Sequence, residues 1–397
     1  MTNFHSNLHS LSICMINPYV THSTGGVQRQ IFLQSRGLSD LKHTVYILQR
    51  HDPLLVGEKM NRWNKAKFLQ TPAFIEFLPE SLGKLFFILF GFLLLWRHRK
   101  KIDVVHAHQL SSPTLIGGLA KFALGMPLIA KATAGGSWGE IRELSKGPLF
   151  RIRRIFFKKI DKLIALTEAM KTEATKWLPI PSDRMILLPN GVDIPLEISA
   201  MKLEEQFRIL YCGRLSNEKR IDLILKAADR LSSIGKICVD LVGPRFQLRD
   251  ATPELQRIAD QIGDHIEIHF HGDQNDPAFF YKNANVFVLP SQSEGMSNSL
   301  LEAMAFGLCC VVSDTSENKV LIEHNVSGLT FELDQLDSLV DRLTTIYKDQ
   351  KETRGAMSRS LGVKAREKVL HSYSSQMIAR CLQDLYQNCL TETAPPS

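Results

Sequence analysis

The sequence predicts an α/β protein of two doubly wound domains, each a parallel sheet covered by helices on both faces. Short apolar runs alternate with longer helical patterns along all 397 residues, which is typical of βαβ units. This alternation is interrupted near residues 188–195, where two prolines and an Asn-Gly pair predict a turn and a linker. The chain length suits two domains of roughly 100–200 residues each.

The first domain is expected to span residues 1–195 and the second residues 196–373. Buried strands are predicted in the first domain at residues 11–16, 44–48, 103–106, 128–130, 163–166 and 186–188. In the second domain they are predicted at residues 208–212, 238–242, 266–270, 286–289, 309–312 and 329–331, with clear helices at residues 221–231 and 297–306. Residues 374–397 form a closing segment, in which a helical pattern at 376–390 precedes a polar tail.

Composition excludes several protein classes. Hydrophobic residues make up 44% of the chain and charged residues 22%, which excludes a disordered chain, a collagen or a coiled coil. No apolar run reaches eighteen residues, and residues 1–12 lack the apolar core of a secretory signal. Four of the seven cysteines, Cys14, Cys212, Cys238 and Cys309, lie in apolar strand-like runs, which favours reduced thiols in a cytoplasmic protein.

The net charge of +7 is unevenly distributed along the chain. Residues 1–195 contain 26 Lys and Arg against 13 Asp and Glu, a balance of +13, and the remaining residues contain 22 against 28, a balance of −6. A basic half joined to a mildly acidic half indicates different partners for each. Anionic lipid, an anionic substrate and nucleic acid all fit the basic half.

Two loops that follow a strand and open a helix have the composition of phosphate-binding loops. Adjacent glycines at Gly25 and Gly26 let backbone N–H groups approach a phosphate without an intervening Cβ. In the second domain, Arg214 can fork onto two phosphate oxygens and Lys219 adds a mobile point charge. The alternatives are an ordinary strand-to-helix turn and a solvated basic loop.

The most specific pattern is residues 290–307, where Glu294 lies in a loop after a strand and Glu302 in the following helix. Ser297 is placed to cap that helix, whose first backbone N–H groups favour an anion. Two carboxylates beside an anion are unfavourable unless they accept hydrogen bonds from neutral hydroxyls, such as those of a sugar or ribose. The alternative is one capping and one solvated glutamate.

His106 and His108 follow the strand predicted at residues 103–106, and alternation puts both on one side of that strand if it continues. A metal pair is conceivable, but no third ligand has zinc-like spacing. The functional interpretation is that one histidine lines a ligand site. The alternative is that one histidine lies in the core and the other in a loop.

In chain order these motifs resemble the retaining glycosyltransferases of family 4, which have the GT-B fold of two facing Rossmann-like domains with an interdomain cleft. The resemblance covers nearly the whole chain and rests on Gly25-Gly26, His106-Ala107-His108, residues 190–193, Gly213-Arg214 with Lys219, and Glu294 with seven residues before Glu302. It implies a nucleotide-sugar donor in the C-terminal domain and an acceptor mainly in the N-terminal domain. It also implies that the last helix crosses back onto the N-terminal domain.

The resemblance further implies a role for each motif. Arg214 and Lys219 would hold the donor diphosphate, where fixed cations stabilise the charge that builds on the leaving phosphate. Glu302 would bind the ribose and Glu294 the donor sugar. The implied catalytic residues are His108, Glu294, Arg214 and Lys219. The implied donor-binding residues are Gly25, Gly26, Arg214, Lys219, Glu294, Gly295, Met296, Ser297, Asn298, Ser299 and Glu302.

No Asp-x-Asp triplet occurs, so we expect a metal-independent hexosyltransferase whose UDP- or GDP-sugar is a substrate, with no cofactor. Residues 131–137 depart from the family's usual His-Gly at that place. We expect acceptor contacts there and at the first histidine, from His106, Thr133, Gly135 and Gly136, with a phosphate near the two glycines. The alternative for residues 131–137 is a plain loop without that role. Residues 315–319 replace the family's usual Gly pair and acid, which leaves the donor-sugar contacts open at that point.

Residues 85–96 are almost wholly apolar, and the basic run 97–101 follows them. Twelve residues are too few to span about 30 Å of hydrocarbon, but they can lie in the interface with the basic run on anionic headgroups. Residues 151–159 form a second basic, apolar segment, and ordinary packing helices are the alternative for both. We therefore expect a cytoplasmic enzyme, peripheral on the inner face of the membrane. Its expected acceptor is lipid-linked or saccharide, in bacterial exopolysaccharide, O-antigen or capsule assembly.

A nucleotide-sugar epimerase or a phosphorylase on the same fold is the nearest enzymatic alternative. The alternative of another class is a non-enzyme whose basic half binds nucleic acid or membrane. Against nucleic acid, the sequence contains no recognised nucleic-acid motif and no stripe of stacking aromatics, so no nucleic-acid partner is expected.

Overall fold

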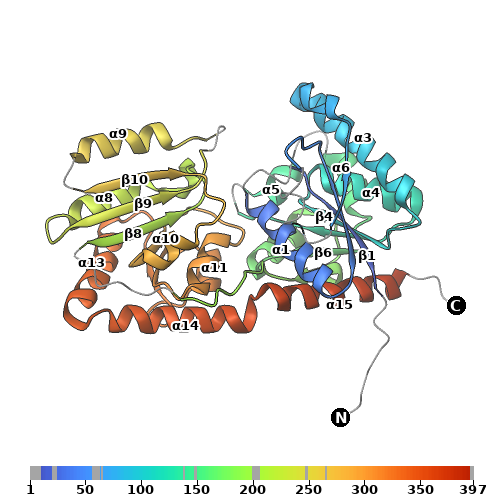
Figure 1. Cartoon of the computed structure of the whole chain (residues 1–397). Helices are drawn as coiled ribbons and strands as arrows, with labels where there is room; N and C mark the ends of the chain where they lie inside the picture. The colour runs from blue at the N-terminus through green and yellow to red at the C-terminus, as the bar shows by residue number, and fades with distance from the viewer. Residues whose placement is uncertain are drawn as a thin grey trace, which may run out of the picture. The chain divides into compact units, whose positions relative to one another are not determined.

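The computed structural model describes residues 10–19, 25–55, 63, 66–136, 139–146, 150–198, 206–245, 249–263 and 266–393. The chain divides into two compact units, Met1–Pro189 with Ser375–Ser397, and Asn190–Ser374. Each unit contains one parallel sheet flanked by helices (Figure 1). The α/β class predicted from the sequence is confirmed.

The first unit contains a seven-stranded sheet in the order β3-β2-β1-β4-β5-β6-β7. All of its pairings are parallel. The strands are β1 (Ser12–Ile16), β2 (Thr44–Gln49), β3 (Lys67–Gln70), β4 (Val104–His108), β5 (Leu128–Lys131), β6 (Lys162–Ala165) and β7 (Met185–Leu187). Six were predicted from the sequence, and β3 was not.

Alternating residues of this sheet pack against different helices, as the period of a strand requires. Ile13, Met15 and Val104 lie in one core cluster with residues of α1 (Gly26–Asp40) and α15 (Ser375–Thr393). Val105 and Leu128 face the other way and contact α4 (Ser112–Leu124). The last helix, α15, therefore belongs to the core of the first unit.

The remaining helices of the first unit lie around these two layers. They are η1 (Ala73–Phe77), α3 (Glu80–His98), α5 (Glu140–Leu144), α6 (Phe150–Phe157), α7 (Glu168–Trp177) and η2 (Ser182–Arg184). α3 and α6 both pack on α4. The apolar segment predicted at residues 85–96 is the middle of α3.

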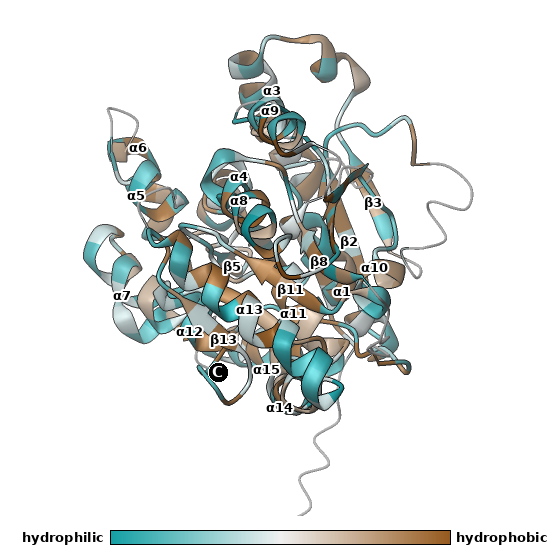
Figure 2. Ribbon diagram, turned by 90° about the vertical axis from the view of Figure 1, so that its left-hand side faces the viewer, coloured by the Kyte–Doolittle hydropathy of each residue, from teal (hydrophilic) through white to brown (hydrophobic). Residues whose placement is uncertain are grey.

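The second unit contains a six-stranded parallel sheet in the order β10-β9-β8-β11-β12-β13. The strands are β8 (Phe207–Cys212), β9 (Ile237–Val242), β10 (Glu267–Gly272), β11 (Val286–Leu289), β12 (Cys310–Ser313) and β13 (Leu329–Phe331). Figure 2 shows β11 in brown, because its four residues are apolar. All four are buried. All six predicted strands are present.

Helices connect these strands and close the unit. They are η3 (Asn217–Lys219), α8 (Asp222–Leu231), α9 (Thr252–Ile262), α10 (Ala278–Asn283), α11 (Asn298–Ala305), α12 (Ser316–Leu321), α13 (Leu336–Thr353) and α14 (Ala356–Ser372). The predicted helices at residues 221–231 and 297–306 correspond to α8 and α11.

The linker region belongs to the second unit. The Val192 N–H donates to the Tyr373 carbonyl over 2.8 Å, and Val192 also pairs with Ser374 in an isolated bridge. Val192 is thus held by backbone hydrogen bonding within the unit Asn190–Ser374, whereas the sequence placed the boundary after Pro195.

Candidate active site

Lys219 and Glu294 meet beyond the carboxyl ends of β8 and β11, two neighbouring strands. The Lys219 ammonium donates to the Glu294 carboxylate, with Nζ 2.7 Å from Oε1. The Ser291 hydroxyl donates to the same oxygen over 2.8 Å. The two charged side chains are 11% and 12% exposed, so this ion pair is largely shielded from water. The structure therefore brings together two residues predicted to contact one ligand.

The loop that carries Glu294 is fixed by hydrogen bonds from three segments. The Gln292 N–H donates to the Glu218 carbonyl over 2.9 Å, which ties this loop to the one that carries Lys219. The Ser313 hydroxyl donates to the Ser291 carbonyl over 2.6 Å. The Asn318 amide in turn donates to the Ser313 hydroxyl over 3.0 Å. Residues 315–319, which depart from the family pattern, thus support the Glu294 loop indirectly, through the hydrogen bond from Asn318 to Ser313.

The start of α11 is capped as the sequence predicts. The Ser297 hydroxyl accepts a hydrogen bond from the Leu300 N–H over 3.3 Å. The Asn190 amide donates to the Met296 carbonyl over 3.4 Å and to the Asn298 side-chain oxygen over 3.1 Å. Asn190, a residue of the Asn-Gly turn, therefore fixes the segment that leads into this helix.

Glu302 lies on α11 and is oriented by Tyr281 of α10. The Tyr281 hydroxyl donates to Glu302 Oε2 over 3.1 Å. Burial, with a smaller contribution from the Glu302 carboxylate, raises the pKa of Tyr281 well above its usual value. The phenol therefore keeps its proton and remains a donor. Tyr281 is a positioning residue that the sequence motifs did not reveal.

Arg214 lies in the loop after β8, with an exposed side chain. Its carbonyl accepts a hydrogen bond from the Tyr211 hydroxyl over 2.9 Å. Gly213 in this loop lies against Gly243, which follows β9, so closely that a Cβ on Gly243 would lie 1.9 Å from the Gly213 carbonyl oxygen. Both glycines also have positive φ angles, 149° at Gly213 and 142° at Gly243. This close approach of the two backbone segments fixes the path of the loop that carries Arg214.

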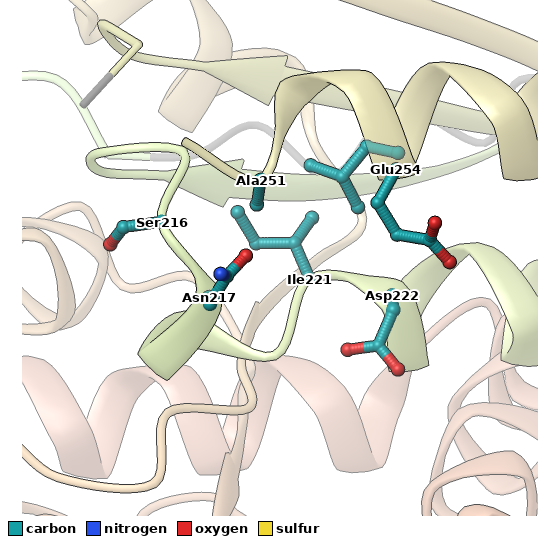
Figure 3. A pocket seen from close by; sticks show the side chains of 7 residues that line it. Ser216, Asn217, Ile221, Asp222, Ala251 and Glu254 are labelled. Atoms are coloured by element: carbon teal, nitrogen blue, oxygen red, sulfur yellow. The ribbon is translucent and has the colours of Figure 1, made fainter. Parts of the chain in front are cut away.

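A pocket of about 210 Å³ lies beside the same loop (Figure 3). It is lined by Ser216, Asn217, Ile221, Asp222, Ala251, Glu254 and Leu255. Figure 3 shows the carboxylates of Asp222 and Glu254 on one side of Ile221. Two carboxylates disfavour an anionic ligand, and none of the predicted donor-binding residues lines this pocket. The pocket is therefore separate from the predicted donor-binding residues.

In the first unit, His106 and His108 lie on one side of β4, as alternation predicts. Their ring centroids are 4.1 Å apart. Both side chains are buried, and neither Nε2 atom has a hydrogen-bond partner among the described residues. His106 Nδ1 is 2.8 Å from the hydroxyl of Tyr386, a residue of α15. Burial lowers the pKa of His106 to about 3 and that of His108 well below its usual value, so both rings are neutral at pH 7.

Buried charged groups adjoin this histidine pair. Lys131 pairs with His108 in the β4–β5 register, and burial lowers its pKa to about 7. Glu140 accepts hydrogen bonds from the Thr133 N–H and hydroxyl, at 2.5 and 2.9 Å, and from the Leu110 N–H at 2.8 Å. Glu140 therefore joins the loops after β4 and β5, a role that no sequence motif indicated.

The other predicted residues of the first unit lie in separate places. Gly25 precedes α1 as its N-cap and Gly26 begins that helix, while Thr24 lies outside the described residues. Near Gly135, the Gly136 N–H donates to the Glu173 carboxylate over 2.8 Å. A carboxylate at this position disfavours a phosphate beside the two glycines and suits a neutral hydroxyl better.

Among the described residues, one group has the donor atoms for a metal ion. The ligand atoms of Cys238, Glu267 and His269 lie within 4.8 Å of one another. The Arg208 guanidinium already donates to the Cys238 sulfur over 3.2 Å, which places a positive charge where a cation would bind. The group lies near the N-terminal ends of β9 and β10, whereas Lys219 and Glu294 follow carboxyl ends.

Both parts of the chain match known families. Residues 24–195 match the family described as Glycosyltransferase Family 4, and residues 197–366 match Glycosyl transferases group 1. A UDP-Gal:alpha-D-GlcNAc-diphosphoundecaprenol alpha-1,3-galactosyltransferase of Escherichia coli is 26% identical over 72% of this chain and 76% of its own length. The capsular polysaccharide biosynthesis glycosyltransferase CapM of Staphylococcus aureus is 21% identical over 76% of this chain and 80% of its own.

Solved structures show the same fold. Sucrose-phosphate synthase of Thermosynechococcus elongatus has a TM-score of 0.76 at 18% identity, covering 96% of this chain and 100% of that one. Anabaena HepE, in complex with UDP-glucose, has a TM-score of 0.75 at 14% identity, covering 95% and 100%. Two Rossmann-like units with parallel sheets, matched in order by these two family profiles, show that the chain belongs to the family 4 glycosyltransferases with the GT-B fold.

Proposed function

We propose that this glycosyltransferase moves a hexose from a UDP- or GDP-sugar to a lipid-linked or saccharide acceptor in the assembly of a bacterial cell-surface polysaccharide. The Escherichia coli relative is named for a UDP-sugar and a diphosphoundecaprenol acceptor, and the Staphylococcus aureus relative for capsule synthesis. The observation that carries the proposal is the shielded Lys219–Glu294 pair, beside the capped start of α11 and the oriented Glu302.

The second unit is proposed to bind the donor. Lys219 and Arg214 would contact the diphosphate, with the backbone of residues 295–299 at the start of α11 beside them. When the glycosidic bond breaks, negative charge builds on the leaving phosphate, and these fixed cations stabilise that state more than the ground state. Glu294 would accept hydrogen bonds from the sugar hydroxyls, and Glu302, held by Tyr281, would accept hydrogen bonds from the ribose hydroxyls.

Donor arrival changes the partners of Lys219. In the structure its ammonium faces one carboxylate oxygen, and an ammonium has three protons to donate. Lys219 can therefore keep Glu294 in place and donate to a phosphate oxygen at the same time. This arrangement supplies positive charge to the diphosphate from the protein, so we propose that transfer needs no metal ion.

The first unit is proposed to bind the acceptor, with His106, Thr133, Gly135 and Gly136 near it and His108 as a contact for the transferred sugar. A neutral imidazole both donates and accepts hydrogen bonds, which suits sugar hydroxyls. We propose that the anomeric configuration is retained by same-face attack, in which the leaving phosphate helps to deprotonate the acceptor. No protein nucleophile is assigned.

The test combines donor binding with product analysis. A thermal-shift screen of nucleotide diphosphates and nucleotide sugars in EDTA should show one base and one sugar that raise the melting temperature, because a ligand at about 100 Kd adds roughly 2.7 kcal/mol to the free energy of unfolding.

The selected donor is then mixed with a short-chain alkyl diphosphate-linked sugar. Nucleotide release only with acceptor, and an α-linked product from an α-linked donor by NMR, are expected. Release at equal rates without acceptor, or an inverted product, would contradict the proposal.

A further inference from the structure

The helix α3 presents an apolar stripe that its own unit does not cover. Leu82, Leu85, Leu89, Leu93 and Trp96 recur at helical spacing and are 45%, 60%, 48%, 41% and 50% exposed. Residues three or four apart lie on one helix face, so these five side chains form a single stripe. We call it the α3 stripe.

The opposite face of α3 is packed against the protein. Gly83, Phe87, Gly91 and Leu95 are buried at spacings of four residues. A Cβ on Gly91 would lie 2.8 Å from the Ile116 side chain, so α3 sits close against α4 at that point. Phe86 and Phe90 pack on Phe74 of η1, with ring centroids 5.9 and 5.8 Å apart.

Positive charge adjoins the α3 stripe. Residues 81–101 contain five Lys and Arg and no Asp or Glu. Arg97, Lys100 and Lys101 are exposed, and no carboxylate among the described residues forms an ion pair with them. The Arg99 guanidinium lies 5.2 Å from the Trp96 ring centroid, which joins the basic end to the apolar stripe.

A second segment, on the other side of α4, also combines exposed apolar side chains with basic residues. Residues 150–160 contain five Lys and Arg and no acid. Ile152 and Ile155 of α6 are each 55% exposed among these charges, and Phe122 of α4 is 67% exposed. Phe156 of α6 would contact a Cβ on Gly118 of α4, so α3, α4 and α6 are successive neighbours in the first unit (Figure 1).

We propose that the α3 stripe and its basic end dock on the interface of an anionic lipid bilayer, with α3 lying in the membrane plane. A helix with one apolar and one packed face inserts its apolar side chains to about the acyl boundary, while Lys and Arg contact the headgroups. Glu80 at the start of α3 is paired with Lys84, whereas the basic end at residues 97–101 contains no acid. Anionic headgroups attract these exposed cations, which a protein partner would not require. This docking deepens the proposed function, because it would bring the enzyme to a lipid-linked acceptor.

An alternative is that α3 crosses the membrane, but the packing of α3 on the first unit disfavours this orientation. α3 has 19 residues and is apolar enough, by length and composition, to cross a membrane. At 1.5 Å per residue it would be about 28 Å long, close to the thickness of the hydrocarbon core. Crossing would detach Phe87, Gly91 and Leu95 from the first unit, whereas docking in the plane keeps their contacts.

The test is sedimentation of the full chain with sucrose-loaded vesicles, without donor or acceptor. Wild type is expected to bind vesicles of 70% phosphatidylcholine and 30% phosphatidylglycerol at least tenfold more tightly than pure phosphatidylcholine, and to be released at pH 11 or by 0.5 M salt. Leu85→Ser with Leu89→Ser, and separately Arg97→Gln with Lys100→Gln and Lys101→Gln, should each weaken binding more than tenfold. A Lys or Arg near the surface contributes roughly fivefold to binding.

Matched controls lie in the second unit. Phe279→Ser with Val363→Ser removes two apolar side chains that are 68% and 50% exposed, and Lys348→Gln with Lys351→Gln and Lys364→Gln removes three exposed charges. Both controls should bind vesicles like wild type. Circular dichroism of every variant checks that the fold is kept.

Three results would overturn the proposal. Equal binding to both lipid compositions, or none, would exclude an anionic docking surface. Resistance to pH 11 extraction would indicate a spanning helix. Self-association by sedimentation velocity that is lost in Leu85→Ser with Leu89→Ser, without vesicle binding, would identify a second copy as the occupant. Glycosyl transfer to a water-soluble acceptor is measured separately, so failure of docking and failure of the proposed activity are distinguishable.

Discussion

The Lys219 ammonium and the Glu294 carboxylate form an ion pair of 2.7 Å, with each side chain about nine-tenths shielded from water. Ser291 gives the carboxylate a further hydrogen bond. A shielded pair of this kind is costly to break from one side, because the remaining charge loses its partner without regaining water. Stability and donor chemistry are therefore linked at Lys219, and variants can separate them.

Lys219→Ala is expected to reduce donor turnover about 100-fold, because a fixed cation at the leaving phosphate is lost. It should also lower the free energy of unfolding by about 3 kcal/mol, because the Glu294 carboxylate is left unpaired. The double variant Lys219→Ala with Glu294→Ala should recover most of the stability and none of the turnover. Urea unfolding at pH 7 and nucleotide release measure the two effects.

Lys226→Ala is the control for this cycle, since Lys226 pairs with Asp222 on an exposed helix face with 47% of its side chain exposed. Its effect on stability should stay within about 0.5 kcal/mol. Near-normal turnover in Lys219→Ala would count against this place as the diphosphate site, whatever the stability result.

Glu302→Ala is expected to remove most donor turnover, whereas Tyr281→Phe should act more mildly on the same carboxylate. The phenol holds Glu302 Oε2 at 3.1 Å, and a hydrogen bond to a charged group is worth about 1.5–3 kcal/mol. We expect the KM for the donor to rise roughly tenfold in Tyr281→Phe, with kcat changed less than threefold. Tyr347→Phe, which removes a 2.8 Å hydrogen bond to the Ile234 carbonyl, is the control. Equal effects of the two phenol deletions would show that Tyr281 acts on stability alone.

The strands were largely predictable because buried parallel strands are continuous apolar runs. β3 escaped the same reasoning because Lys67–Gln70 is a four-residue edge strand in which only Leu69 is buried. α3 is longer than its apolar centre, because Glu80 and Ser81 at its start and Arg97 and His98 at its end complete helical turns without adding to the apolar run.

In the candidate site, the charged residues were predictable and their supports were not. Lys219, Glu294 and Glu302 follow strands in a recognisable order, so a motif could identify them. Tyr281 lies 21 residues from Glu302, and Tyr386 lies 280 residues from His106. Each tyrosine reaches its partner through packing of a separate helix, α10 or α15. No local pattern encodes that packing.

The free energy of unfolding is expected to fall as the pH falls from 7 towards 4, because His106 and His108 stay neutral in the folded chain. Burial holds the folded pKa of His106 near 3, whereas an unfolded histidine binds a proton below about 6.5. The unfolded state therefore binds more protons, and each such histidine adds a slope of about 1.4 kcal/mol per pH unit in this range. His106→Gln with His108→Gln should flatten the dependence measured by urea unfolding.

Lys131 and Glu140, which adjoin the histidines, change the stability over other pH ranges. Lys131, with a folded pKa of about 7, should make stability rise with pH between about 7 and 10.5, and Lys131→Met should remove that rise. Burial raises the pKa of Glu140, so its contribution falls as the pH rises and opposes the histidines at the acid end. A flat dependence in wild type would contradict the burial of neutral rings.

Gly243→Ala is expected to disrupt the loop after β8 that carries Arg214, because its new Cβ would lie 1.9 Å from the Gly213 carbonyl oxygen, at a φ of 142°. Gly263→Ala separates steric overlap from backbone strain, since its φ is also positive, at 75°, and nothing lies within 4 Å of its Cβ. With φ 75° and ψ −157°, Gly263 lies in a backbone region that is almost confined to glycine, where alanine costs roughly 1–3 kcal/mol. Gly263→Ala should lose about that much stability and keep its affinity for the nucleotide. In Gly243→Ala the backbone segments at Gly213 and Gly243 must move apart, which displaces Arg214. The affinity of the folded protein for the nucleotide, measured by calorimetry, should therefore fall at least tenfold. Equal affinities in the two variants would show that the Gly213–Gly243 contact does not position Arg214 for the donor.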